Sequence, residues 1–139
     1  MTMPAHVSSG GHPRAMALAL PAIVVVLAAA SVYAATASDK PPGDPAHGKT
    51  LYQVCMGCHS LDEDDVGPRH RGVVGRVAGT VSGYAYSPAL KDSHIVWDRE
   101  TLDRWLTNPQ ALVPGAKMFF AMPGAQDRAD VIAYLAEQR

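Results

Sequence analysis

Five consecutive residues combine two thiols and an imidazole at fixed spacing, in the run Cys55-Met56-Gly57-Cys58-His59. The chain has no other cysteine. In this C-x-x-C-H pattern each sulfur can add to one vinyl group of a haem, because a two-residue spacer on a helical turn presents both sulfurs to one porphyrin edge. The imidazole that follows can bind the iron. We therefore predict one haem c, attached covalently through Cys55 and Cys58, with His59 as an iron ligand.

Three other uses of a cysteine pair compete with haem attachment. A structural disulfide suits an oxidising compartment, but it leaves His59 and the glycine-rich stretch after it without a role. A thioredoxin-like redox pair belongs next to a βαβ pattern, which the sequence does not indicate. A structural zinc site needs four ligands, and no second Cys or His pair has matching spacing. The motif, together with the export signal described next, favours haem.

An apolar segment near the start of the chain indicates export. No residue from Ala15 to Ala37 is charged, Arg14 precedes the segment, and small residues suitable for cleavage end it. An uncleaved membrane anchor is the alternative, although Pro21 and the many alanines favour cleavage. We predict a signal peptide or anchor over 1–37, a linker over 38–45 and one domain over 46–139. The location is then periplasmic, either soluble or tethered to the inner membrane.

The charge balance after this segment argues against a nucleic-acid partner. All 13 acidic residues and 11 of the 12 basic residues follow residue 37, so no basic excess is present. About 100 residues bury only a modest core, to which a large cofactor would add.

The elements that must position the motif are short helices. One is predicted from about Ala46 to Gly57, a second from the N-cap Asp98 to Thr107, and a third over about 126–137. Glycines and prolines indicate ordered loops over 67–87 and 110–124. Loops of that length need a central organiser, so we predict an all-α fold wrapped around one haem.

The other axial ligand stays open from these residues alone. The candidates are Met118, Met122, His47, His70 and His94. A single methionine is often core filler. Met118 stands out because it lies in a proline- and glycine-bounded loop that can pass close to a flat ring.

The chain from about Gly48 to Leu135 resembles the class I c-type cytochromes, the soluble cytochromes c of mitochondria and bacteria. After C-x-x-C-H, the matching pieces follow in the family's order. They are Gly67-Pro68, Gly72-x-x-Gly75-Arg76, Gly83-Tyr84-x-Tyr86, Trp97, Asn108-Pro109, Pro114-Gly115-x-Lys117-Met118-x-Phe120 and Arg128-x-Asp130-Val131-Ile132-Ala133-Tyr134-Leu135.

The resemblance implies roles for particular residues. Met118 matches the family's methionine ligand, opposite His59. Pro68 matches the proline whose carbonyl accepts the other ring N–H of the axial histidine. Tyr86 and Trp97 match groups that hydrogen-bond a haem propionate. The remaining matches are Arg76, a charge near that propionate, and Gly48 and Tyr52, which pack the first helix across the last.

Two departures from the family are visible. Trp105, Leu90 and Ala116 stand where tyrosine, asparagine and threonine are common, so we expect a drier methionine side. The acidic run Asp62-Glu63-Asp64-Asp65 follows the motif where a basic docking rim would begin. It is either a solvated loop or a docking feature.

The resemblance implies an electron-transfer protein rather than an enzyme. It would pass one electron between redox partners, a reductase and an oxidase or dehydrogenase, and would be monomeric. A haem subunit of a larger exported oxidoreductase is one alternative. A peroxidase or gas-binding haem protein is another, and it requires an open axial position.

Overall fold

The computed structural model describes residue 10 and residues 40–139, so the predicted signal or anchor segment lies outside the described residues. The described part is helical, with an isolated antiparallel bridge between Val77 and Val96 and no strand. None of its helices is long and apolar enough to cross a membrane. The predicted all-α class is confirmed.

The first helix begins where the sequence predicts and carries the haem motif at its end. Helix α1 (Pro45–Leu51) has proline in its first turn, where the missing N–H costs nothing. The side chain of Asp44 accepts two backbone N–H groups of that turn. The chain then tightens into the 3₁₀ helix η1 (Tyr52–Gly57), which ends just before Cys58.

The middle of the chain holds one predicted helix and two short helices that the sequence analysis did not predict. Helix α3 (Arg99–Thr107) starts with a capping box between Asp98 and Thr101. Helices α2 (Pro88–Lys91) and α4 (Pro109–Leu112) are single turns, each with proline near its start and a side-chain cap, Ser87 and Asn108 respectively. They are too short for hydrophobic periodicity to reveal, which is why the prediction missed them.

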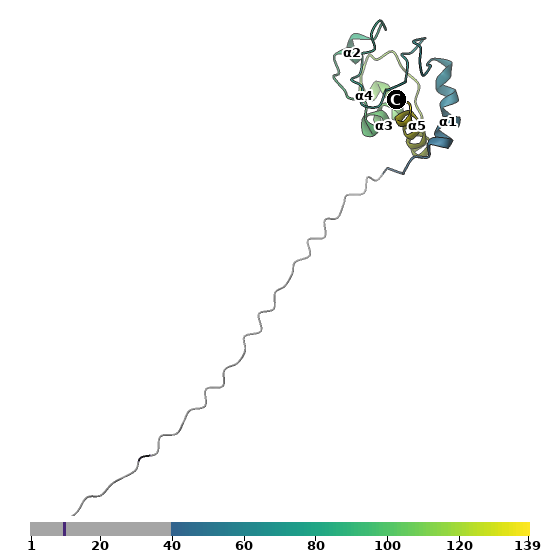
Figure 1. Ribbon diagram of the computed structural model, residues 1–139. Helices are drawn as coiled ribbons and strands as arrows, with labels where there is room; N and C mark the ends of the chain where they lie inside the picture. Colours follow the sequence, from purple (N-terminus) through teal and green to yellow (C-terminus); the bar gives the residue numbers. More distant parts are fainter. Residues whose placement is uncertain (1–9, 11–39) are drawn as a thin grey trace, which may run out of the picture. The chain divides into compact units, whose positions relative to one another are not determined.

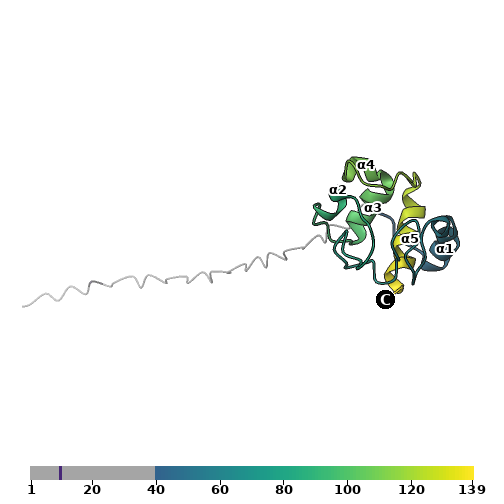
Figure 2. The same cartoon turned by 90° about the horizontal axis from the view of Figure 1, so that it is seen from above.

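Helix α5 (Ala125–Glu137) packs across α1, and Figures 1 and 2 both show the two side by side. Gly48 lies buried at the crossing. A Cβ atom there would lie 2.5 Å from the carbonyl carbon of Asp130 and 3.0 Å from the Cβ of Tyr134, and still closer to the Asp130 oxygen. The absence of a side chain at Gly48 therefore sets how closely the two helices approach.

The buried carboxylate of Asp130 stabilises the contact between α1 and α5 through hydrogen bonds. Asp130 accepts hydrogen bonds from the backbone N–H of Asp44 at 2.7 Å, from His47 Nδ1 at 2.8 Å and from Gln126 Nε2 at 2.8 Å. The bond to Asp130 raises the pKa of His47, and the bond from His47 lowers the pKa of Asp130. The two ends of the chain's folded part are thus joined by apolar packing and by an ion pair.

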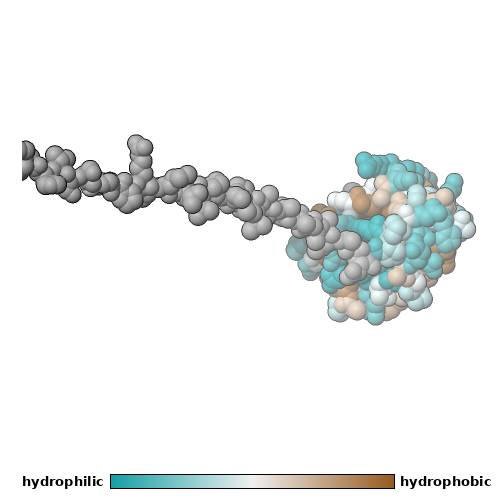
Figure 3. All heavy atoms as spheres, turned by 90° about the horizontal axis from the view of Figure 1, so that it is seen from below, coloured by the Kyte–Doolittle hydropathy of each residue, from teal (hydrophilic) through white to brown (hydrophobic). Residues whose placement is uncertain are grey.

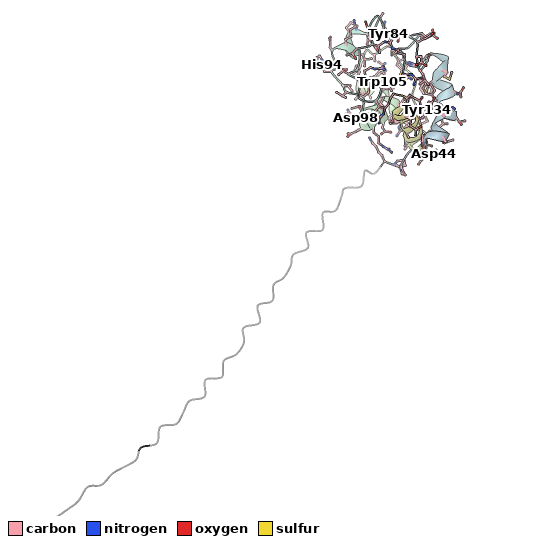
Figure 4. The ribbon with its side chains drawn as sticks, viewed as in Figure 1. Asp44, Tyr84, His94, Asp98, Trp105 and Tyr134 are labelled. Atoms are coloured by element: carbon pink, nitrogen blue, oxygen red, sulfur yellow. The ribbon has the colours of Figure 1, made fainter. Side chains whose placement is uncertain are left out.

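Helix α5 also packs on α3. The guanidinium of Arg128 donates to Asp103 Oδ1 at 2.7 Å and to the carbonyl oxygens of Met122 and Pro123 at 2.9 and 2.8 Å. The core between these helices includes Trp105 and Tyr134, which Figure 4 labels. This frame holds the loops that form the site.

Candidate functional site

A largely apolar cavity of about 300 Å³ opens among η1, the loop over 66–77, α3 and the loop that follows α4. Aliphatic and aromatic side chains make up most of its wall, as expected for a large apolar ligand. All four residues predicted to hold the haem line it: Cys55, Cys58, His59 and Met118. Sequence positions up to 63 residues apart are therefore brought to one cavity.

The imidazole of His59 is fixed in orientation and tautomer. Its Nδ1 lies 2.7 Å from the carbonyl oxygen of Pro68. A carbonyl can only accept, so Nδ1 carries the hydrogen and Nε2 keeps its lone pair in the neutral ring. Burial lowers the pKa of His59, which favours this neutral form. Gly67 abuts the ring so closely that a Cβ there would overlap it.

A second imidazole stacks on the first, which the sequence did not indicate. The ring centroids of His59 and His70 are 4.0 Å apart, with 22° between the planes. His70 Nδ1 also forms a 3.0 Å hydrogen bond with the hydroxyl of Tyr52. Burial, with smaller effects of His59 and Arg76, lowers the pKa of His70 to about 3. Because it packs on His59, His70 is badly placed to bind the opposite side of the same iron.

The two cysteines lie in the cavity wall and form no disulfide with each other. Cys55 is half-buried and Cys58 is exposed. Burial raises the pKa of the Cys55 thiol. The backbone N–H groups of Cys58 and His59 both donate to the carbonyl of Cys55, so one tight turn presents the three side chains together.

The other candidate ligands lie away from the cavity. Met122 is buried in the core, and its backbone N–H donates to the carbonyl of Leu106. His47 binds Asp130 at the crossing of α1 and α5. His94 is exposed and lies at the periphery in Figure 4. Of the five candidates, Met118 and His70 line the cavity, and His70 is the one stacked on His59.

Three residues matched to the propionate region also line the cavity: Arg76, Tyr86 and Trp97. Arg76 donates to the carbonyl oxygens of Arg69 and Arg71. Burial raises the pKa of Tyr86, so its phenol stays protonated as a hydrogen-bond donor. Among the departures from the family, Leu90 and Trp105 line the cavity, whereas Ala116 is buried beside it and is not part of the wall.

The acidic run is partly neutralised by its own loop. Asp62 pairs with Arg71, at 2.5 Å to Nε and 3.0 Å to Nη2, and Asp64 pairs with Arg69 at 2.9 Å. The backbone N–H of Arg69 also donates to Asp64. The face drawn in Figure 3 is mostly hydrophilic, with smaller hydrophobic areas.

These features suit a haem in three ways. The wall is apolar where a porphyrin needs burial, two thiols stand beside a fixed histidine, and a donor sulfur lies in the same wall. A short-helix fold with these four side chains in one apolar cavity fits a haem protein of the c type.

Comparison with known proteins agrees with this class. The family model described as Cytochrome c matches residues 45–139. Cytochrome c2 of Rhodomicrobium vannielii is 44% identical over 119 residues, which cover 83% of this chain and 94% of the relative. Cytochrome c 2.1 of Caenorhabditis elegans is 47% identical over 102 residues, 70% of this chain and 92% of the relative.

A solved structure, cytochrome cH from Methylobacterium extorquens, has 43% sequence identity and a TM-score of 0.66, covering 68% of this chain and 98% of that one. The chain belongs to the cytochrome c family. It is a single-haem electron-transfer protein with one covalently attached haem c, and proteins of this family act with redox partners.

Proposed function

We propose that Cys55 and Cys58 would each hold the haem through a thioether bond and that His59 and Met118 would bind its iron. The observation that carries the proposal is that all four side chains line one apolar cavity. In each attachment, the sulfur bonds to a vinyl carbon and the thiol hydrogen goes to the neighbouring carbon. Tyr86 and Trp97 would donate hydrogen bonds to a propionate, with Arg76 close by.

The chain's own groups prepare the site for electron transfer. When bound, haem c supplies an iron that gains and loses one electron. His59 presents Nε2 without rotating, because Pro68 and Gly67 hold its ring. Leu90 and Trp105 would help exclude water, and Met118 would supply a thioether, a ligand that favours the ferrous state of haem iron. With both His59 and Met118 as ligands, the iron would have no open position for a substrate.

We therefore propose a monomeric electron carrier rather than an enzyme, working in the periplasm between a reductase and an oxidase or dehydrogenase. The C-x-x-C-H motif and the apolar segment before Ala37 support that location. A short-lived complex of small area suits such a carrier.

The axial assignment is tested by comparing Met118→Ala with Met122→Ala in protein matured in a periplasm. Met118→Ala should lose the far-red band of ferric iron bound to methionine sulfur and should bind carbon monoxide in the ferrous form. Met122→Ala removes an equal side chain from the core and should keep the band. The reverse pattern would show that Met122 is the ligand.

The attachment is tested separately with Cys55→Ala and Cys58→Ala combined. Acid–organic extraction should leave haem on the wild-type chain and remove it from the double variant. Haem that stays on the double variant after extraction would contradict the thioether assignment.

A further inference from the structure

Gln110 is a polar side chain beside the site that takes no part in the proposed haem binding. Gln110 is half-buried in α4, one residue after the Asn108-Pro109 pair that starts the helix. Its Nε2 donates to the carbonyl oxygens of Ala116 and Met118, at 2.8 and 2.9 Å. Its Oε1 accepts from the backbone N–H of Gly115 at 3.2 Å.

These three bonds identify which end of the amide is which. Two carbonyl oxygens can only accept, so they face the NH₂ group, and a backbone N–H can only donate, so it faces the oxygen. Both amide hydrogens and the oxygen are therefore used. One side chain holds three points of the same loop, over 115–118.

The loop has few other restraints at this point. Its neighbouring backbone bonds are Ala116 N–H to the carbonyl of Val113, at 3.1 Å, and Met122 N–H to the carbonyl of Leu106, at 2.7 Å. Lys117 Nζ donates to the carbonyl of Ala85. Within residues 40–139, no hydrogen bond other than that from Gln110 reaches Met118.

We infer that Gln110 is a positioning residue that clamps the loop carrying Met118 and so keeps the Met118 thioether in the cavity. The inference rests on the proposed Met118 ligation. Helix α4 gives the clamp a fixed base, because Asn108 Oδ1 accepts the N–H of Ala111 and the buried Pro109 anchors the turn.

The clamp has a measurable consequence for added ligands. An external base such as imidazole binds the iron only when Met118 has left it, so its apparent affinity scales with the fraction of protein in that open state. Each lost hydrogen bond shifts such an equilibrium by several-fold. Removing both bonds from Nε2 should raise the apparent imidazole affinity of the ferric protein roughly tenfold.

The experiment titrates ferric holoprotein with imidazole for the wild type, Gln110→Ala, Gln110→Glu and Gln126→Ala. Gln110→Glu keeps an acceptor for Gly115 but places carboxylate oxygens against two carbonyls, so it should open the loop at least as much as Gln110→Ala. Gln126→Ala is the matched control, because its Nε2 also donates two hydrogen bonds, to Pro42 and Asp130, and neither reaches the loop over 115–118. It should lower the melting temperature and leave the imidazole affinity within about twofold.

The outcomes separate the clamp from the ligand assignment. A wild-type far-red band, a rise in affinity for both Gln110 variants and no rise for Gln126→Ala support the clamp. If the wild type shows the band and the Gln110 variants match it in affinity, the clamp is wrong and Met118 ligation stands. A wild type without the band overturns both.

Discussion

Replacing Gly48 with alanine tests the packing that joins the two ends of the folded chain. The added methyl group would lie 2.5 Å from the carbonyl carbon of Asp130, which is backbone and cannot rotate away. Overpacking costs about 1–3 kcal/mol, and this obstruction belongs at the upper end. Because alanine favours a helix more than glycine does, the substitution also adds back about 1 kcal/mol to the free energy of unfolding. The net loss of unfolding free energy is about 2 kcal/mol, or roughly 8–16 °C in melting temperature for a domain of this size.

Thermal unfolding of the holoprotein, followed by far-ultraviolet circular dichroism, measures this change. Thr50→Ala is the control, because Thr50 is exposed in the same helix and the substitution brings the propensity gain without the clash. It should leave the melting temperature unchanged or raise it slightly. A Gly48→Ala protein as stable as Thr50→Ala would refute the claim that close approach of α1 and α5 requires glycine.

Three further substitutions test an ion pair, a helix cap and a set of buried hydrogen bonds, each by thermal unfolding. Folding raises the pKa of His47, so the stability that its ion pair with Asp130 contributes is complete below about pH 6.5 and is lost as the pH rises through the folded pKa. The difference in melting temperature between the wild type and His47→Ala should therefore be larger at pH 5.5 than at pH 9. A difference that does not shrink at pH 9 would contradict the ion pair. Asp98→Ala should cost about 1 kcal/mol through loss of the α3 cap, and no change would mean that the capping box contributes nothing. Arg128→Met should cost about 2 kcal/mol because Asp103 and two carbonyls lose a donor, and a neutral result would show that methionine packing offsets them.

The sequence predicted the elements that have strong local signals. Asp98 with the apolar spacing of Leu102, Trp105 and Leu106 was sufficient for α3, and the periodicity of α5 was sufficient to within a residue. Helices α2 and α4 were missed because a single turn has no periodicity. Proline after Ser87 and after Asn108 was the available signal.

The site was predictable where chemistry depends on residue type and spacing. The C-x-x-C-H motif pointed to Cys55, Cys58 and His59 by itself, whereas Met118 needed the family resemblance to distinguish it from Met122. The stacking of His70 on His59 and the three bonds of Gln110 are long-range or loop-specific contacts. No pattern along the chain encodes them, since they depend on how the loops return to one another.

The arginines that pair with the acidic run weaken its electric field at long range. With Asp62 held by Arg71 and Asp64 by Arg69, opposite charges sit a few ångströms apart, so much of their field cancels beyond roughly 8–10 Å in physiological salt. A redox partner diffusing toward the molecule would therefore sense chiefly the charges of Glu63 and Asp65 from this loop, rather than those of all four carboxylates. Encounter rates at this face should therefore vary less with ionic strength than they would if all four carboxylates were unpaired.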